Sequence, residues 1–68
     1  MKLSARNALN GKITKVVKGN TTSHVCIHVS GGTITASITN EAVDELMLKE
    51  GQSAAAIIKA SDVMVGVE

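Results

Sequence analysis

Three short segments rich in hydrogen-bond donors mark the places where strands are expected to begin or end. They are Ser4-Ala5-Arg6-Asn7, Thr39-Asn40 and Lys59-Ala60-Ser61. Together they offer hydroxyls, a guanidinium, an ammonium and backbone N–H groups, and none contains a carboxylate. A helix starting after Thr39 would add unpaired N–H groups, which attract anions. These segments would suit a small anion, although ordinary turn and capping roles would account for the same residue types.

A second chemical pattern is His24-x-Cys26-x-His28. On a strand these three side chains point to the same face, and histidine and cysteine are common zinc ligands. A closed shell needs a fourth ligand, which the sequence does not supply, and Cys26 is equally explained as a small apolar residue. Metal binding therefore remains an alternative, and no metal site is predicted.

Catalysis finds little support in the residue types. Cys26 and a neighbouring histidine resemble a nucleophile and its base, but side chains two positions apart on a strand are separated by roughly 7 Å, beyond hydrogen-bond reach. Four of the six acidic residues fall within residues 41–50, where a solvated helix face explains them. We therefore predict that the protein is not an enzyme.

The elements that position these segments follow from hydrophobic periodicity. Residues 24–29 and 33–39 alternate apolar and polar side chains, which is typical of half-buried strands. Residues 12–18 are rich in β-branched side chains, and the adjacent Val16 and Val17 indicate a bulge. Hairpin turns are expected at Gly19-Asn20 and Gly31-Gly32.

The period changes after the third expected strand. Thr39 or Asn40 can cap a helix whose first turn is acidic, and Gly51 is expected to end it. One face of this helix is apolar, formed by Val43, Leu46 and Met47. Residues 53–59 then form an apolar run, and residues 63–67 alternate again.

Three meandering strands, one helix and two further strands match the order of the OB-fold. The sequence thus predicts an all-β protein: a small five-stranded OB-fold-like barrel with one short helix between strands 3 and 4. At 68 residues it has room for one domain, spanning residues 1–68.

So small a chain rarely buries enough apolar surface to be stable alone. Cys26 is the only cysteine, so no intrachain disulfide can form, while 44% of the residues are apolar. We therefore expect self-association. The absence of an apolar leader or a membrane-spanning run predicts a cytoplasmic protein with no membrane partner. With no aromatic residue and a net charge of +1, single-stranded nucleic acid is a weak alternative to an anion.

The three donor segments, in this order and spacing, resemble those of the molbindin (Mop) family. The resemblance extends over Ile38-Thr39-Asn40 and residues 58–64 and covers essentially the whole chain. It implies a hexamer that binds molybdate or tungstate between subunits and serves for storage or homeostasis.

By the same resemblance, one subunit is expected to contribute Ser4, Ala5 and Arg6 to each site. Its neighbour is expected to contribute Thr39, Lys59, Ala60 and Ser61. Lys59 would supply charge, the hydroxyls would donate hydrogen bonds, and Ala5, Arg6 and Ala60 would act mainly through the backbone. Relatives often carry serine three residues after the threonine, where this chain has Ala42.

A donor-only site also has a chemical preference. Molybdate, tungstate and sulfate are fully ionised dianions that accept hydrogen bonds and donate none. Protonated phosphate would find no acceptor for its O–H. Rejection of sulfate would then depend on the size of the site.

Overall fold

A four-stranded antiparallel sheet, in the order β3-β2-β1-β4, forms the framework of the computed structural model, which describes residues 2–68. The elements run in chain order as β1 (Asn7–Lys18), β2 (Thr22–Val29), β3 (Gly32–Thr39), the helix α1 (Asn40–Glu45), β4 (Ser53–Ile58) and the 3-10 turn η1 (Ala60–Asp62). The predicted meander, helix and fourth strand are therefore confirmed, and the chain is a small all-β domain with one short helix.

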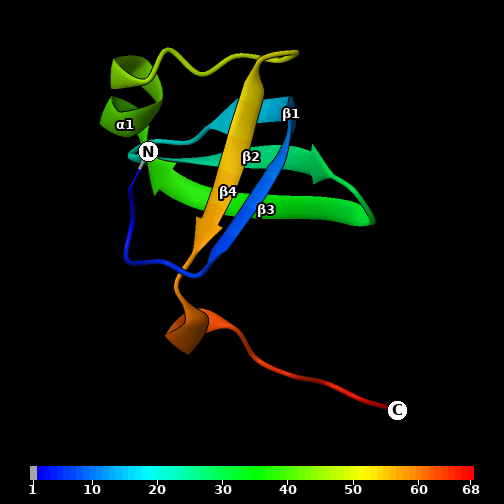
Figure 1. Cartoon of the computed structure of the whole chain (residues 1–68). Helices are drawn as coiled ribbons and strands as arrows, with labels where there is room; N and C mark the ends of the chain where they lie inside the picture. Colours follow the sequence, from blue (N-terminus) through cyan, green and yellow to red (C-terminus); the bar gives the residue numbers. More distant parts are fainter. Residues whose placement is uncertain (1) are drawn as a thin grey trace.

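The long strand β1 belongs to both halves of the sheet. Its first half pairs with β4 and its second half with β2, and Gly11 takes part in both ladders. A Cβ atom at Gly11 would lie 2.1 Å from the backbone oxygen of His28, so only glycine fits at this close approach. Figure 1 shows that β1 is curved along its length and that β4 crosses over β2 and β3.

The core fills the space enclosed by this curvature. It consists of Ile13, Val25, Ile27, Val29, Val43 and Ala56. The alternation predicted for residues 24–29 is confirmed, because β2 buries every second residue. Ser23 continues the buried face and is the only buried polar residue in the described chain.

The helix α1 is shorter than predicted, and Gly51 does not end it. Leu46 caps the C-terminus and Met47 adopts a left-handed φ of 51°. The N–H of Leu48 donates to the Val43 carbonyl at 3.0 Å, and that of Met47 to the Asp44 carbonyl at 3.1 Å. These two bonds form a Schellman motif, which satisfies the last carbonyls of this six-residue helix after fewer than two turns.

This early ending changes which apolar residues face the core. Of the predicted helix face, only Val43 is buried, while Leu46 is 61% and Met47 77% exposed. Leu48, beyond the helix, packs against the core in their place. Gly51, with φ of 85°, belongs to the turn before β4.

The predicted hairpins and bulge are present, but each is displaced. The β1–β2 turn is closed by a 2.8 Å bond from the N–H of Gly19 to the Thr22 carbonyl, and three residues connect the strands. The β2–β3 turn is Ser30-Gly31, one residue earlier than expected, because Gly31 adopts the positive φ of 94°. The bulge lies at Thr14, where the register with β2 shifts, rather than at Val16-Val17.

The fifth strand predicted at residues 63–67 is not a strand in the single chain. After η1 the backbone runs out to Glu68 without a ladder partner (Figure 1). A strand needs an edge to pair with, and η1 directs this segment away from both edges of its own sheet. The sheet is therefore open between β3 and β4. No helix in residues 2–68 is long and apolar enough to cross a membrane.

Candidate functional site

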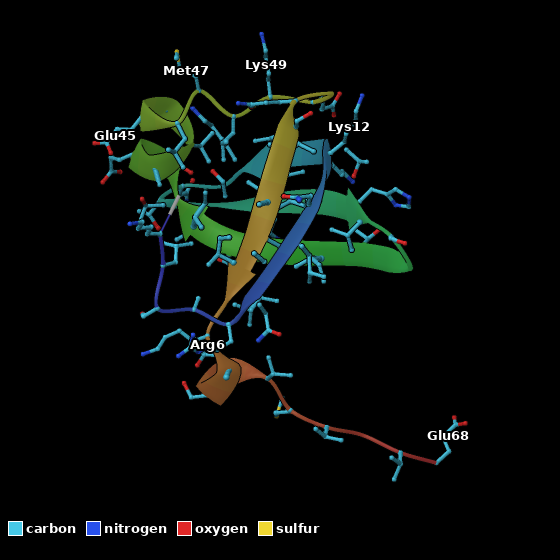
Figure 2. All side chains as sticks on the ribbon, in the orientation of Figure 1. Arg6, Lys12, Glu45, Met47, Lys49 and Glu68 are labelled. Atoms are coloured by element: carbon cyan, nitrogen blue, oxygen red, sulfur yellow. The ribbon has the colours of Figure 1, made fainter. Side chains whose placement is uncertain are left out.

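The first and third donor segments meet at one corner of the sheet. Asn7 is paired with Ile58 where β1 begins and β4 ends, and the Asn7 side-chain amide donates to the Ile58 carbonyl at 3.2 Å. Ser4–Arg6 directly precede this pair and Lys59–Ser61 directly follow it. Figure 2 shows Arg6 beside the η1 turn. The fold thus brings together two segments that are more than fifty residues apart in the sequence.

The η1 turn presents backbone donors at this corner. Lys59 is extended, with φ −64° and ψ 140°, and its carbonyl accepts the N–H of Asp62 at 2.9 Å. The first N–H groups of a 3-10 turn, here those of Ala60 and Ser61, have no carbonyl partner inside the turn. Both residues are exposed.

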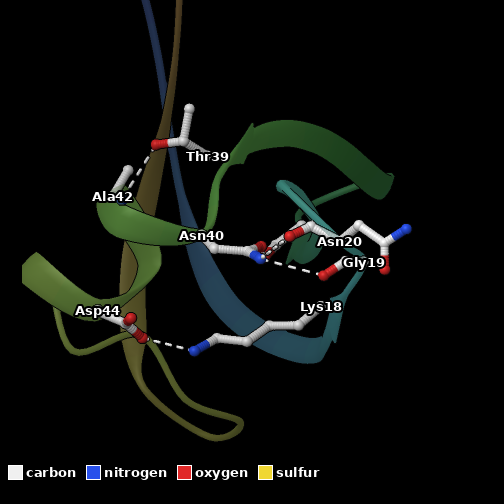
Figure 3. A network of polar contacts seen from close by, with 8 residues as sticks. Lys18, Gly19, Asn20, Thr39, Asn40, Ala42 and Asp44 are labelled. Atoms are coloured by element: carbon white, nitrogen blue, oxygen red, sulfur yellow. Dashed lines mark hydrogen bonds and ion pairs between the residues drawn. The ribbon is translucent and has the colours of Figure 1, made fainter.

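Thr39 ends β3 and caps α1. Its Oγ1 accepts the N–H of Ala42 at 3.1 Å, so the hydroxyl hydrogen remains able to donate to a ligand (Figure 3). The N–H of Asn40 donates to the Thr21 carbonyl at 3.0 Å. The start of α1 therefore offers fewer free N–H groups than predicted, because two of them are bonded within the chain.

Asn40 has a structural role that the sequence did not reveal. Its side-chain Nδ2 donates to the carbonyls of Gly19 and Asn20 at 3.0 and 3.3 Å, and its Oδ1 accepts the buried Ser23 hydroxyl at 2.5 Å. Figure 3 shows this network tying the β1–β2 turn to the start of α1. The partners lie 17 to 21 residues away, so no local pattern indicates them.

An apolar groove lies next to both the Thr39 segment and the corner where β1 begins and β4 ends. The groove is lined by Ile38, the residue before Thr39, and by Ile58, the residue before Lys59. Both strands therefore end beside the same groove. None of the seven predicted site residues lines it. In one chain these seven residues, here called the donor rim, are all exposed or half-buried.

The cationic side chains of this rim are not neutralised by ion pairs within the chain. Arg6 and Lys59 are exposed, and the single ion pair recorded among residues 2–68 joins Lys18 to Asp44. Asp62 in η1 is the nearest acid along the chain and is also exposed. The rim therefore combines two uncompensated positive charges with hydroxyl and N–H donors, as an anion site requires.

The His24-x-Cys26-x-His28 pattern lies on the opposite, outer face of β2. Two of its cross-strand neighbours on β1 are lysines, Lys12 opposite His28 and Lys15 opposite Cys26, and the third is Val17 opposite His24. Cys26 Sγ lies 3.9 Å from the Thr35 hydroxyl. In the part of the chain that the structure describes, no three His, Cys, Asp or Glu side chains are placed to hold a metal ion. On the other side, the β3 residues paired with the pattern are Ser37, Thr35 and Thr33, so its strand neighbours are lysine, valine and hydroxyl side chains.

Comparison with known proteins connects this rim to a family. The TOBE domain matches residues 3–65. The chain is 48% identical over 69 residues to a probable molybdenum-pterin-binding protein of Haemophilus influenzae, and the match covers the whole of both chains.

Two solved structures share the fold. MopII from Clostridium pasteurianum, in an apo form, superposes with a TM-score of 0.90 at 40% identity, covering 97% of this chain and all of that one. The cytoplasmic molybdate-binding protein ModG, with molybdate bound, gives a TM-score of 0.94 at 46% identity; the match covers the whole of this chain and 49% of ModG.

Proposed function

The chain belongs to the Mop (molbindin) family of TOBE-domain proteins, and on this premise we propose that it binds molybdate or tungstate at sites shared between its copies. The observation that carries the proposal is the donor-only rim: Ser4–Arg6 and Lys59–Ser61 meet at one corner, and Thr39 ends the strand beside the same groove. Molybdate bound to ModG, a structure with 46% identity, supports the choice of anion.

Each predicted residue has a role that its position allows. Lys59 supplies positive charge, and the hydroxyls of Ser4, Thr39 and Ser61 donate hydrogen bonds. The backbone N–H groups of Ala5, Arg6 and Ala60 complete the donor set. The ammonium and the backbone N–H groups can only donate, and together with the hydroxyl hydrogens they favour a fully ionised dianion, which needs no acceptor from the protein. Ala42 provides no side-chain hydroxyl, which removes one possible contact.

The site is proposed to need two chains. The seven residues are exposed or half-buried and enclose no cavity in one chain, whereas a small dianion gains most from hydrogen bonds when donors surround it and displace water. As the family resemblance implies, each site takes Ser4, Ala5 and Arg6 from one copy and Thr39 and Lys59–Ser61 from its neighbour, so the two segments that meet at the corner of one chain belong to different sites. The assembly is a hexamer, in which each barrel has five strands.

The biological role that follows is storage or homeostasis of the oxyanion in the cytoplasm, without catalysis and without an organic cofactor. The relative from Haemophilus influenzae is named a probable molybdenum-pterin-binding protein, whereas ModG is described as a cytoplasmic molybdate-binding protein, and its bound molybdate supports the free oxyanion as the ligand.

Mixed subunits test the sharing of the site. Arg6→Glu and Lys59→Glu each place a carboxylate in the rim and should abolish molybdate binding when every chain carries the same change. If each site draws its two halves from different chains, mixing the two variants should restore part of the binding, because some sites then contain two unchanged halves. Recovery is measured by equilibrium dialysis against molybdate after unfolding and joint refolding. No recovery in mixtures whose subunits demonstrably exchange would place both segments of a site on one chain.

A further inference from the structure

The side chain of Asn7 joins β1 to β4 at the corner where the two donor segments meet. Asn7 is the first residue of β1, it is half-buried, and its amide Nδ2 donates to the carbonyl of Ile58, the last residue of β4, at 3.2 Å. The backbone pairing of the two strands also stops at this pair of residues. The amide is therefore the last link between the strands before both segments leave the sheet.

This hydrogen bond fixes the peptide plane from which the third donor segment starts. The peptide group between Ile58 and Lys59 is planar and trans, so the Lys59 N–H points opposite to the Ile58 carbonyl. Holding the carbonyl thus also sets the direction of the Lys59 backbone. The next residues follow rigidly, because η1 is closed by bonds from the N–H of Asp62 to the Lys59 carbonyl at 2.9 Å and from that of Val63 to the Ala60 carbonyl at 3.3 Å.

The η1 turn has little else to hold it against the sheet. Among the hydrogen bonds and ion pairs recorded for residues 2–68, those of residues 59–62 lie within the turn itself. Lys59, Ala60 and Ser61 are also exposed, so burial does not fix them. Strand ends with exposed backbone bonds open readily. The Asn7 amide is therefore the contact that limits movement of this turn.

We propose that Asn7 is a positioning residue of the oxyanion site, which holds Lys59–Ser61 in the orientation that binds the anion and acts through these residues rather than by touching the anion. This inference rests on the proposed function. A donor set that is held in place before binding loses less conformational freedom when the anion binds. Asn7 also follows directly after Ser4–Arg6, so one side chain holds together donor segments that belong to two different sites.

Asn7→Leu tests the proposal, because leucine has nearly the size of asparagine and lacks the amide donor. Asn10→Leu is the matched control. Asn10 lies on the same strand opposite Ala55 of β4, is exposed, and makes no side-chain hydrogen bond recorded within residues 2–68. Asn7→Leu should weaken molybdate binding about 3- to 10-fold by calorimetry, the range that one neutral hydrogen bond implies, and Asn10→Leu should bind as the unchanged protein does.

A double-mutant cycle with Lys59→Ala distinguishes positioning from a general loss of structure. If Asn7 places Lys59, the Lys59→Ala change should cost a smaller factor in affinity in the Asn7→Leu background than in the unchanged protein. Independent effects would multiply instead. Losses that multiply, or an affinity of Asn7→Leu equal to that of Asn10→Leu, would overturn the proposal.

Hydrogen exchange without any anion tests the positioning separately from binding. The N–H groups of Asp62 and Val63, which close η1, should exchange faster in Asn7→Leu than in Asn10→Leu, whereas the amides between β2 and β3 should exchange equally in both. Equal exchange in the turn would overturn the proposal. If the unchanged protein bound no molybdate, the proposed function would fail, and the exchange rates alone would decide whether Asn7 orders the turn.

Discussion

Replacing Asn40 with alanine should lower the free energy of unfolding by more than is usual for a half-exposed residue. The change leaves the Ser23 hydroxyl, which is fully buried, without its acceptor and removes two bonds to the β1–β2 turn. An orphaned buried hydroxyl costs about 1–3 kcal/mol and two exposed hydrogen bonds together about 1 kcal/mol, so the free energy of unfolding should fall by about 2–4 kcal/mol. A domain of this size is stable by only about 3–10 kcal/mol, so the loss is a large fraction.

Urea unfolding followed by circular dichroism measures the effect, at one protein concentration because assembly contributes to stability. Adding Ser23→Ala to Asn40→Ala supplies the control, because this double variant has no buried hydroxyl left without an acceptor. The double variant should therefore be more stable than Asn40→Ala alone. A loss below about 0.5 kcal/mol for Asn40→Ala, the range of ordinary surface changes, would refute the reasoning, as would strictly additive losses.

Three further substitutions test the fold and the site. Gly11→Ala should cost about 3 kcal/mol or more, because its Cβ collides with the backbone of β2, whereas Gly32→Ala, where nothing lies within 4 Å, should change the unfolding midpoint little. Met47→Gly should raise stability by about 0.5–1 kcal/mol, because glycine adopts the left-handed φ of 51° without strain; Leu46→Gly, at φ −84°, should lower it instead. Lys59→Ala should weaken molybdate binding about 10- to 150-fold, the equivalent of one charge-assisted hydrogen bond, and equal calorimetric affinity would remove Lys59 from the site.

Local periodicity predicted the framework of the fold because its signals are carried by neighbouring residues. The alternation along residues 24–29 and the cap at Thr39 are confirmed. The prediction that Gly51 ends the helix was wrong. Met47 adopts the left-handed φ at the helix end, a conformation for which glycine is the usual residue. The position of the bulge at Thr14 depends on register with a neighbouring strand, which no local pattern specifies.

In the candidate site, too, the features carried by neighbouring residues could be predicted and those that depend on distant residues could not. The donor chemistry of Ser4–Arg6 and Lys59–Ser61 was visible in the sequence, but their meeting at one corner depends on the pairing of Asn7 with Ile58, residues 51 positions apart. The predicted fifth strand at residues 63–67 is absent from the single chain, since a strand forms only where an edge is available. Periodicity identifies a segment that favours pairing, and it does not identify the chain with which it pairs.

Titration calorimetry with molybdate, tungstate, sulfate and phosphate tests the central claim most directly. The account predicts saturable heat with molybdate and tungstate and little with sulfate or phosphate, because the site takes only fully ionised dianions and selects the larger ones. Equal binding of sulfate would contradict selection by size and leave a generic anion site. Absence of heat with all four anions, together with retention of single-stranded DNA by the same protein, would contradict oxyanion binding itself.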